Sequence, residues 1–424
     1  MKKALLFTFF VVFTAGVFAQ VTNDNTLVPK RKCGTMENLQ MMREQDPTLI
    51  DREIAYEKMI QQLIEANKEN AVIENGKVIV TIPTVVHVLG SSVSTSITDS
   101  RVQEQIDVLN QDYAGLSTHS MELFSSSLKI DTEIRYCLAK RTPANASTNG
   151  IERRTTGVPT SFSYGTTMKY TSSGGLDSWD YTKYMNIWVC NLSGGLCGFA
   201  EFPSTFGATY GVVIHYQYFG KTGAYAPYNL GGTTSHEIGH CFNLRHIWGD
   251  ESACSGTDYC TDTPNQASEN YGNHSGLVTD ACTTTSPGIM YMNFMDYSDD
   301  IDYANFTPNQ KTRMWASLNS TLASLKTSNG CTPLTGMDEI DITGFVSVYP
   351  NPTQGNITVQ MLNGSDNISI KVYDIVGKEI QGIKITRSSF QVYNVDLSLQ
   401  KAGIYFLSIN DGNGTTTKKI SLIN

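Results

Sequence analysis

The spacing of hydrophobic residues changes several times along the chain, and each change predicts a different kind of element. Apolar residues at helical spacing predict helices in three segments: residues 47–70, 98–115 and 307–325. Alternating, β-branched residues predict strands in three others: residues 77–89, 185–192 and 210–220. Thr307 is the expected N-cap of the last helix, with Pro308 in its first turn. Strands mixed with a few long helices predict an α/β or α+β fold for residues 78–333.

The pattern changes again at Phe345, where short strands follow one another at even spacing. A stretch rich in Thr, Ser, Asn and Gly separates them from the preceding helix. We therefore expect a linker at residues 334–342 and an all-β, immunoglobulin-like sandwich at residues 343–424.

The first 19 residues have the pattern of a secretory signal peptide. Lys2 and Lys3 precede an apolar run that ends at Ala19, so we expect cleavage before Gln20. The alternative is a membrane anchor, but the run is shorter than the roughly 20 residues that a spanning helix needs. No later segment has the length and apolarity to span, so we expect an exported protein without a transmembrane segment.

Composition limits the classes of function. The chain has 424 residues, which predicts two or three folded units, and its 40% hydrophobic content excludes wholesale disorder. Lys and Arg number 31 against 40 Asp and Glu, and the net charge of -9 argues against nucleic acid as the main partner. Nothing in the sequence indicates an obligate oligomer, so we expect a monomer.

The chain contains nine cysteines, and export to an oxidising compartment predicts that most of them pair. Because nine is odd, at least one thiol stays free or is lost during processing. Counting alone does not give the connectivity. Cys190 and Cys197 flank a short loop and are close enough in sequence to pair locally.

The segment TSHEIGHCFNLRHIWGD carries the chemistry. His236 and His240 are four residues apart, so both imidazoles project from one face of a helix and can bind one zinc ion. His246 completes a set of three ligands if the chain turns back after the helix, and the open fourth position is typical of a catalytic site. Glu237 has the spacing of a carboxylate that takes a proton from water. The alternative is a helix that carries the five-residue motif by chance, but the third histidine makes the extended pattern far more specific.

This extended pattern resembles that of the metzincin metalloproteases, which carry HExxHxxGxxH and a later turn with a methionine beneath the zinc. The segment MNFMDYSDD matches that turn, with Met295 as its methionine. Tyr297 matches a tyrosine that several metzincins use near the metal. Asn243 replaces the usual glycine and is the next most tolerant residue of a positive φ. The region as a whole is similar to the pappalysin branch, which implies a metzincin-like catalytic domain with a central zinc-binding helix.

The pappalysin resemblance implies a calcium ion in the loop after the third histidine. The matching residues are Asp258, Thr263 and the carbonyl of Thr261, whose hard oxygens suit calcium. A polar turn without an ion is the alternative. The resemblance also implies that a disulfide holds this loop, with Cys254 and Cys282 as the pair.

Some bacterial pappalysins favour arginine directly after the scissile bond, through an acid near the methionine turn. The matching residue is Asp300, which would pair with a guanidinium at the floor of a pocket. The alternative is a surface or calcium-side acid, and the following residues depart from the usual family sequence.

The pro-segment expected at residues 20–77 also has a family counterpart. Metzincin zymogens place the cysteine of an Arg-x-Cys-Gly element at the fourth position of zinc, and residues 31–34 match that element. Cys33 would be the latch, which also accounts for the odd cysteine count. The alternative is that Cys33 pairs with another cysteine. We expect the activating cut between residues 68 and 78.

Residues 343–424 resemble the sorting domains of proteins exported by the type IX secretion system of Bacteroidetes. The alternative is a substrate- or carbohydrate-binding module. Such modules expose aromatic residues on one face, whereas Tyr349, Tyr373 and Tyr405 alternate here like core residues.

Together these patterns predict a secreted or surface-located zinc endopeptidase made as a zymogen, acting on protein or peptide substrates and exported by the type IX machinery. A non-catalytic surface-binding protein or adhesin on the same scaffold is the main alternative, although such a relative would have lost Glu237 or a histidine. A zinc hydrolase of other substrates fits the methionine turn less well. We expect residues 198–202 to form an edge strand that pairs with extended substrate.

Overall fold

The structure is a computed structural model, and it describes these residues: 30–69, 79–251, 254–334, 346–361, 368–389, 391–410 and 415–423. The expected signal peptide at residues 1–19 lies outside the described residues. So do most of the expected linker and most of the segment expected to contain the activating cut. No helix of the described ranges is long and apolar enough to cross a membrane.

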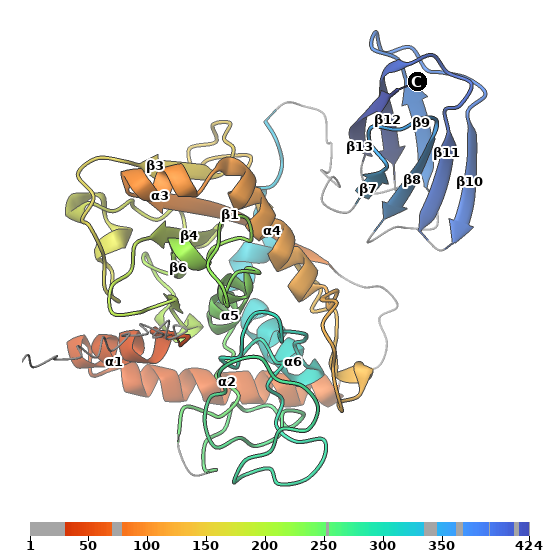
Figure 1. Cartoon of the computed structure of the whole chain (residues 1–424). Coiled ribbons are helices and arrows are strands. Elements are labelled where there is room, and N and C mark those ends of the chain that lie inside the picture. The colour runs from red at the N-terminus through yellow and green to blue at the C-terminus, as the bar shows by residue number, and fades with distance from the viewer. Residues whose placement is uncertain are drawn as a thin grey trace, which may run out of the picture. The chain divides into compact units, whose positions relative to one another are not determined.

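Helices and strands alternate in the first three quarters of the chain, and strands alone follow (Figure 1). The α-helices are α1 (Thr35–Gln45), α2 (Leu49–Glu69), α3 (Ser91–Ser96), α4 (Asp99–Tyr113), α5 (Gly232–Cys241) and α6 (Pro308–Leu318). The strands are β1 (Val80–Leu89), β2 (Ile134–Leu138), β3 (Ile151–Arg154), β4 (Met185–Cys190), β5 (Gly198–Ala200), β6 (Val212–His215), β7 (Val346–Tyr349), β8 (Asn356–Met361), β9 (Ser369–Tyr373), β10 (Lys384–Ser389), β11 (Val392–Asp396), β12 (Gly403–Asn410) and β13 (Thr415–Leu422). The short 3₁₀ helices are η1 (Ser126–Leu128), η2 (Thr167–Lys169), η3 (Thr171–Ser173), η4 (Pro203–Thr205), η5 (Tyr216–Tyr218) and η6 (Ala323–Thr327).

The expected catalytic region, residues 78–333, is built on one mixed sheet with the order β2-β1-β4-β6-β5, in which β3 also pairs with β1. Strands β1 to β4 and β6 all run parallel to one another, and β4 and β6 are buried along their whole length. Their near-continuous apolar sequences are what a parallel sheet covered on both faces requires. The predicted strands at residues 77–89, 185–192 and 210–220 correspond to β1, β4 and β6.

Strand β5 lies at the edge of this sheet and is antiparallel to β6. It is shorter than the predicted edge strand, because the chain turns into η4 after Phe202. Helix α5 packs against both β5 and β6, so the edge strand runs alongside the helix that carries the histidine motif.

Helices α4 and α6 begin where their side-chain caps predict. The Thr98 hydroxyl accepts a hydrogen bond from the Arg101 N–H, and Thr307 and Gln310 form a reciprocal capping box. Helix α6 ends at Leu318, before the predicted end at residue 325, and η6 continues part of that segment.

The expected pro-segment forms two helices where the sequence predicted one. Helix α1 was not predicted, because its apolar residues do not follow a clear helical face; α2 corresponds to the predicted helix. Helix α2 packs against α6, where both oxygens of Glu57 accept hydrogen bonds from the buried guanidinium of Arg313 at 2.8 and 2.9 Å. The Tyr56 hydroxyl donates to Ser317 Oγ at 3.0 Å.

The prediction that most cysteines pair is wrong for the described residues. Two disulfides form, Cys137–Cys331 and Cys254–Cys282, and the second is the pair that the family resemblance implied. Five cysteines have free thiols, all buried: Cys33, Cys190, Cys197, Cys241 and Cys260. The local pairing of Cys190 with Cys197 does not form, because the two side chains join different hydrophobic clusters.

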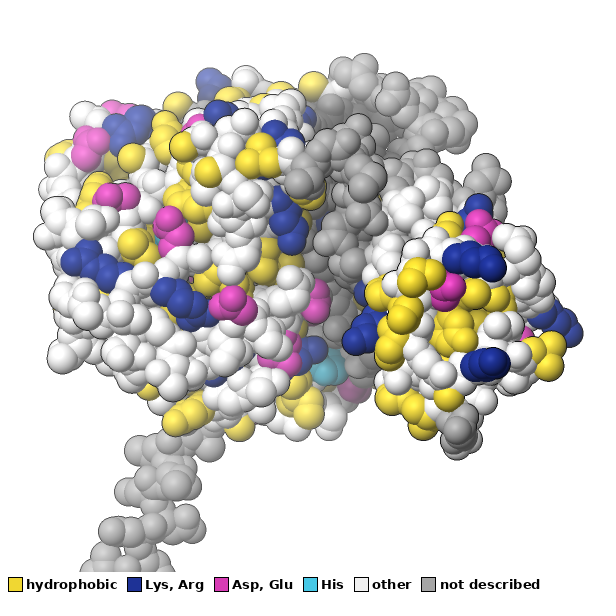
Figure 2. All heavy atoms as spheres, turned by 90° about the horizontal axis from the view of Figure 1, so that it is seen from above, with side chains coloured by type: hydrophobic (Ala, Val, Ile, Leu, Met, Phe, Trp, Pro, Cys, Tyr) yellow, Lys and Arg dark blue, Asp and Glu magenta, His cyan; other side chains and the backbone are white. Residues whose placement is uncertain are grey.

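The C-terminal region has two antiparallel sheets, with the orders β10-β11-β8-β7 and β13-β12-β9, consistent with the predicted sandwich. Their apolar faces enclose a core of their own, which shares no residue with the core of the catalytic region. Strand β10 was not predicted, since its sequence is mostly polar. The expectation that Tyr349 is a core residue is wrong, as 47% of it is exposed, whereas Tyr405 is buried. On the face shown in Figure 2, basic and acidic side chains are interspersed.

Candidate active site

Three histidines converge at the end of α5, a helix whose ten residues are all buried. The Nε2 atom of His240 lies 3.2 Å from Nε2 of His236 and 3.2 Å from Nε2 of His246. Two nitrogens bound to one tetrahedral zinc ion at about 2.0–2.1 Å are about 3.3 Å apart, so the spacing suits that metal.

The second ring nitrogen of each imidazole, Nδ1, has a hydrogen-bond partner of its own. Each Nδ1 atom lies within hydrogen-bonding distance of an acceptor: Phe294 O at 2.7 Å for His236, Leu244 O at 2.8 Å for His240, and an Asp250 carboxylate oxygen for His246. Because Nδ1 donates its proton in each pair, the three Nε2 atoms direct lone pairs at one point. Burial lowers the pKa of His236 and His240, and the neighbouring imidazoles lower it further. Neutral imidazoles whose lone pairs face one another require a cation between them, so the donor set fits a metal ion.

The turn after α5 brings the third histidine back to the other two. Asn243 has a φ of 68°, which confirms the positive φ that its replacement of glycine predicted. The Leu244 N–H bonds to Gly239 O at 3.0 Å and closes the turn. His246 then lies beside the helix although it is six residues beyond His240.

Glu237 points toward the edge strand and is almost completely buried. Its Oε2 atom accepts a hydrogen bond from the Thr35 hydroxyl at 3.0 Å and lies 3.3 Å from Cys33 Sγ. Gly198 makes room for it, since a Cβ there would lie 3.0 Å from the Glu237 side chain. Burial raises the pKa of Glu237 to about 7, although both hydrogen bonds lower it.

Cys33 joins the histidines as a fourth potential ligand. Its sulfur and one nitrogen of each of His236, His240 and His246 all lie within 4.8 Å of one another. The separation from His240 Nε2 is 3.6 Å. Burial and the charge of Glu237 raise the pKa of the Cys33 thiol well above its ordinary value, so a cation in the cluster is needed to hold it as thiolate.

Met295 and Tyr297 lie close to the cluster. Met295 is fully buried beneath α5, and a Cβ on Gly239 would lie 2.6 Å from its sulfur, so the glycine is needed for this approach. The ring of Tyr297 lies 5.0 Å from that of His246 and 5.7 Å from that of His236. Burial, followed by the charge of Cys33, raises the pKa of Tyr297, so its hydroxyl keeps its proton.

Asp300 binds the guanidinium of Arg31, and we call the residues around that guanidinium the Asp300 pocket. The Arg31 guanidinium donates to Asp300 Oδ1 at 2.5 Å and to Thr233 Oγ1 at 2.9 Å. It also lies over the rings of Tyr228 and Tyr303, at 4.3 and 5.0 Å from their centroids. Arg31 and the Asp300 carboxylate are both almost fully buried, and the structure therefore brings an arginine of the expected pro-segment to the acid that was predicted to bind arginine.

The expected pro-segment runs along the edge strand in the same direction as that strand. Cys33 and Gly198 form a parallel bridge, with hydrogen bonds from Cys197 N to Lys32 O and from Gly34 N to Gly198 O, both 2.8 Å long. Its path therefore leads from the Asp300 pocket, past the histidine cluster, toward the Phe202 end of the strand.

Two of the three residues predicted to bind calcium are in direct contact. The Thr263 hydroxyl donates to Asp258 Oδ2 at 2.8 Å, and both residues are buried. The third predicted ligand is the carbonyl of Thr261, an exposed residue whose hydroxyl accepts a hydrogen bond from the Asn309 amide. Burial raises the pKa of Asp258 to about 6.

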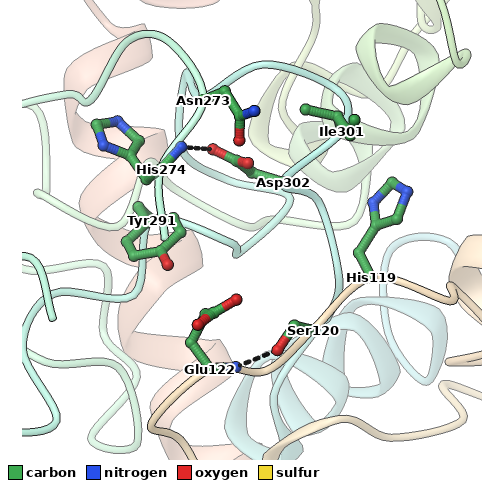
Figure 3. A pocket seen from close by; sticks show the side chains of 8 residues that line it. All are labelled: His119, Ser120, Glu122, Asn273, His274, Tyr291, Ile301 and Asp302. Atoms are coloured by element: carbon green, nitrogen blue, oxygen red, sulfur yellow. Dashed lines mark hydrogen bonds between the residues drawn. The ribbon is translucent and has the colours of Figure 1, made fainter. Parts of the chain in front are cut away.

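A separate pocket of about 240 Å³ shares no lining residue with the histidine cluster (Figure 3). It contains His119, Glu122, His274 and Asp302, and Asp302 accepts a hydrogen bond from the His274 N–H at 2.8 Å. Its potential ligands do not converge. Among the described residues, only the cluster of Cys33 and the three histidines brings three or more of them within 4.8 Å.

Sequence reasoning missed three residues of the site. Arg31 belongs to the recognised Arg-x-Cys-Gly element, and joining it to the predicted arginine pocket of Asp300 would have given its role. Asp250 lies four residues after His246, a spacing that suggests a hydrogen-bonding partner. Thr35 carries no sequence signal, because its contact with Glu237 depends on the path of the pro-segment.

Comparison with known proteins identifies the family of this chain. Residues 171–319 match the family model described as pregnancy-associated plasma protein-A. The chain is 31% identical over 288 residues to an extracellular metalloprotease of Colletotrichum graminicola, and the alignment covers 65% of this chain and 88% of that protein. The chain belongs to the pappalysin family of zinc metalloproteases.

Solved structures resemble the pappalysin region as well. A Tannerella forsythia promirolysin mutant is 36% identical with a TM-score of 0.62, covering 70% of this chain and 97% of its own. Mirolysin bound to a small compound is 41% identical with a TM-score of 0.56, covering 59% of this chain and 96% of its own. Residues 347–423 match a secretion-system C-terminal sorting domain, so this pappalysin carries a type IX sorting domain, which indicates secretion or surface localisation.

Proposed function

We propose that this pappalysin is a zinc endopeptidase made as a zymogen, which cleaves peptide bonds before arginine. The observation that carries the proposal is the group of four ligands: three histidine Nε2 atoms and Cys33 Sγ within 4.8 Å, with Glu237 beside them. Three ligands come from the catalytic domain and one from the pro-segment, so removal of the pro-segment opens one position.

In the active enzyme, His236, His240 and His246 would hold the metal. A bound zinc ion supplies a Lewis acid that activates water and polarises the substrate carbonyl. Glu237 accepts a proton from the attacking water and delivers it to the leaving amine. Its carboxylate lies 3.3 Å from the Cys33 sulfur, which places it next to the position that water takes when the cysteine leaves. Met295 supports the helix from below, and the Tyr297 hydroxyl donates to the developing oxyanion.

Two contacts of the pro-segment account for latency. Cys33 would be the fourth ligand of a bound metal, and Arg31 fills the pocket that ends in Asp300. If that pocket receives the residue after the scissile bond, a substrate runs antiparallel to β5, whereas the pro-segment runs parallel to it. The pro-segment therefore presents its peptide bonds in the reverse direction and is not cut at the cluster.

The preference for arginine follows from the contacts of the Asp300 pocket. One carboxylate oxygen already accepts from the Leu230 and Gly232 N–H groups, which leaves the other for a guanidinium. The two tyrosine rings suit the flat face of arginine better than the compact ammonium of lysine.

Activation removes residues 20–77 by a cut between residues 68 and 78, after α2. The promirolysin structure covers 70% of this chain and the mirolysin structure 59%, a difference that matches the described part of the pro-segment in size. The sorting domain directs export by the type IX machinery, and calcium bound by Asp258, Thr261 and Thr263 would stabilise the loop after the third histidine.

The test is incubation of the self-processed full chain with a mixed peptide library, and identification of every new terminus by mass spectrometry. We expect cuts before arginine that disappear in Glu237→Ala and after treatment with a zinc chelator, and that return when zinc is restored. A folded, zinc-loaded protein that makes no cuts would refute the proposal and favour the surface-binding protein. Cuts without a bias for arginine would retain the protease and refute the pocket.

A further inference from the structure

The path of the pro-segment along β5 has a second end, opposite Asp300, and this end also carries a charge. From Cys33 the pro-segment continues past Thr35, whose hydroxyl accepts from the Ala200 N–H, toward Phe202. Leu39 and Leu49 of the pro-segment pack on Phe202 in a small buried cluster. Since substrate runs in the opposite direction, this end receives the residues that precede the scissile bond.

Arg245 forms the polar part of this second end. Its guanidinium lies over the Phe202 ring at 5.0 Å from the centroid, and that ring is in edge contact with the His240 imidazole at 5.4 Å. Arg245 is half-buried, and its Nε atom has no hydrogen-bond partner among the described residues. A cation one residue from His246 thus lies beside the path of the substrate with an unused donor.

The pro-segment presents a carboxylate to this region, as it presents a guanidinium to Asp300. Glu57 of α2 pairs with Arg313, whose side chain also donates to Asn243 O in the turn before Arg245. Burial raises the pKa of Glu57, but the hydrogen bonds and charge of Arg313 and the charge of Arg245 outweigh it and lower the pKa overall. Glu57 therefore lies in the field of both arginines, and release of α2 removes this acid from them.

We propose that Arg245, supported by Phe202, forms a subsite that selects an acidic residue on the N-terminal side of the scissile bond. This inference rests on the proposed function, and it defines the substrate class: extended peptides with an acid before the bond and arginine directly after it. The opposite charges of Arg245 and Asp300 at the two ends of this path orient such a peptide in one direction.

The position of the acid follows from strand spacing. A substrate strand advances about 3.3 Å per residue, and Phe202 is four residues beyond Gly198, which lies opposite the latch cysteine. The chain bends into η4 directly after Phe202, which shortens this path. The acid is therefore expected two to four residues before the scissile bond.

The test uses the self-processed full chain and peptides that carry arginine directly after the bond, with Glu, Gln or Lys placed in turn at the second, third and fourth positions before the bond. At one position we expect kcat/KM for Glu to exceed that for Gln by about three- to fivefold at low salt, the range of a partly exposed ion pair. This ratio should fall toward one in 1 M NaCl. Arg245→Gln should abolish the preference for the Glu peptide, and Arg245→Lys should retain most of that preference. Arg245→Glu should instead favour the Lys peptide.

Lys183→Gln is the matched control, since it removes one exposed positive charge whose partner is Asp180, and the ratio should not change. If the wild type cleaves the Glu and Gln peptides equally at all three positions, the subsite proposal is refuted but the proposed protease activity is not. Cleavage of no peptide would refute the proposed function itself. N-terminal sequencing of the processed enzyme completes the test, because a mature chain that retains Glu57 would also overturn the subsite.

Discussion

Asp300 is held in place by the backbone before any guanidinium arrives. One of its oxygens accepts two N–H groups from the segment that leads into α5, so the carboxylate cannot turn away from the pocket. We expect Asp300→Asn to lower kcat/KM for cleavage before arginine by about tenfold or more, because a charge-assisted hydrogen bond is replaced by a neutral one. Kinetics with paired peptides that carry Arg or Met after the bond measure this, with Asp302→Asn as control, since Asp302 lines the separate pocket. An unchanged Arg-to-Met ratio in Asp300→Asn would contradict the assignment.

Cys33 is the other residue whose role can be isolated. We expect Cys33→Ala to shorten the time in which purified zymogen converts to the mature form, because the fourth position at the metal is then open to water. Gel time courses and activity measurements follow the conversion. Cys190→Ala is the control, since it removes an equally buried thiol far along the sequence from the cluster and should leave the rate unchanged. A Cys33→Ala zymogen that stays intact and silent would show that Arg31 and the helices of the pro-segment suffice for latency.

Helices α4 and α5 are joined by a buried acid, and this contact makes the stability of the catalytic domain depend on pH. Burial raises the pKa of Asp112 to about 7 from an ordinary value of 3.8, although the hydrogen bond from Ser235 lowers it. The Asp112 carboxyl therefore takes up a proton on folding. Its contribution to the free energy of unfolding is fully present below about pH 4 and is lost as the pH rises through 7.

The measurement uses a Glu237→Ala background, which prevents self-cleavage. Between pH 5 and pH 8 we expect Tm to fall less in Asp112→Asn than in the parent, by a few kelvin. This difference corresponds to about 1 kcal/mol or more of unfolding free energy. Calorimetry of the catalytic-domain transition is the measurement. Asp99→Asn is the control on the same helix, because Asp99 is exposed and pairs with Arg153 at the surface. Equal pH slopes in the wild type and Asp112→Asn would show that Asp112 is ionised in the folded protein.

Elements with a strong local pattern could be predicted from the sequence, and elements that depend on distant partners could not. Helices α4 and α6 have clear caps, and β1 and β4 have long apolar runs, so each was expected close to its place. Helix α1 and strand β10 have weak patterns, and packing or strand pairing stabilises them instead.

The same distinction applies to the site. His236, Glu237 and His240 share one helix, so spacing alone groups them. The turn at Asn243 was inferred from one residue with a tolerance for positive φ, and the structure contains it. The contacts of Arg31 with Asp300 and of Thr35 with Glu237 join residues more than 200 positions apart, and no local pattern carries that information.

At the scale of the whole molecule, the catalytic region and the sandwich are built as separate units. Their hydrophobic cores share no residue, and the disulfide Cys137–Cys331 closes the catalytic region just before the sandwich begins. Each core is therefore complete without the other, as expected for domains that fold independently. The family matches divide the chain in the same way, at residues 171–319 and 347–423.

We therefore expect a chain truncated after residue 334 to keep kcat/KM within about twofold of the full chain when both are activated and assayed on one arginine peptide. In a host with a type IX system, the truncated protein should remain inside the outer membrane, whereas the full chain should reach the medium or the cell surface. Fractionation and immunoblotting follow its location. The control is a Glu237→Ala full chain, which should be exported normally, because export depends on the sandwich and not on activity. A large loss of kcat/KM in a truncated protein of native Tm would mean instead that the sandwich contributes to catalysis or to substrate binding.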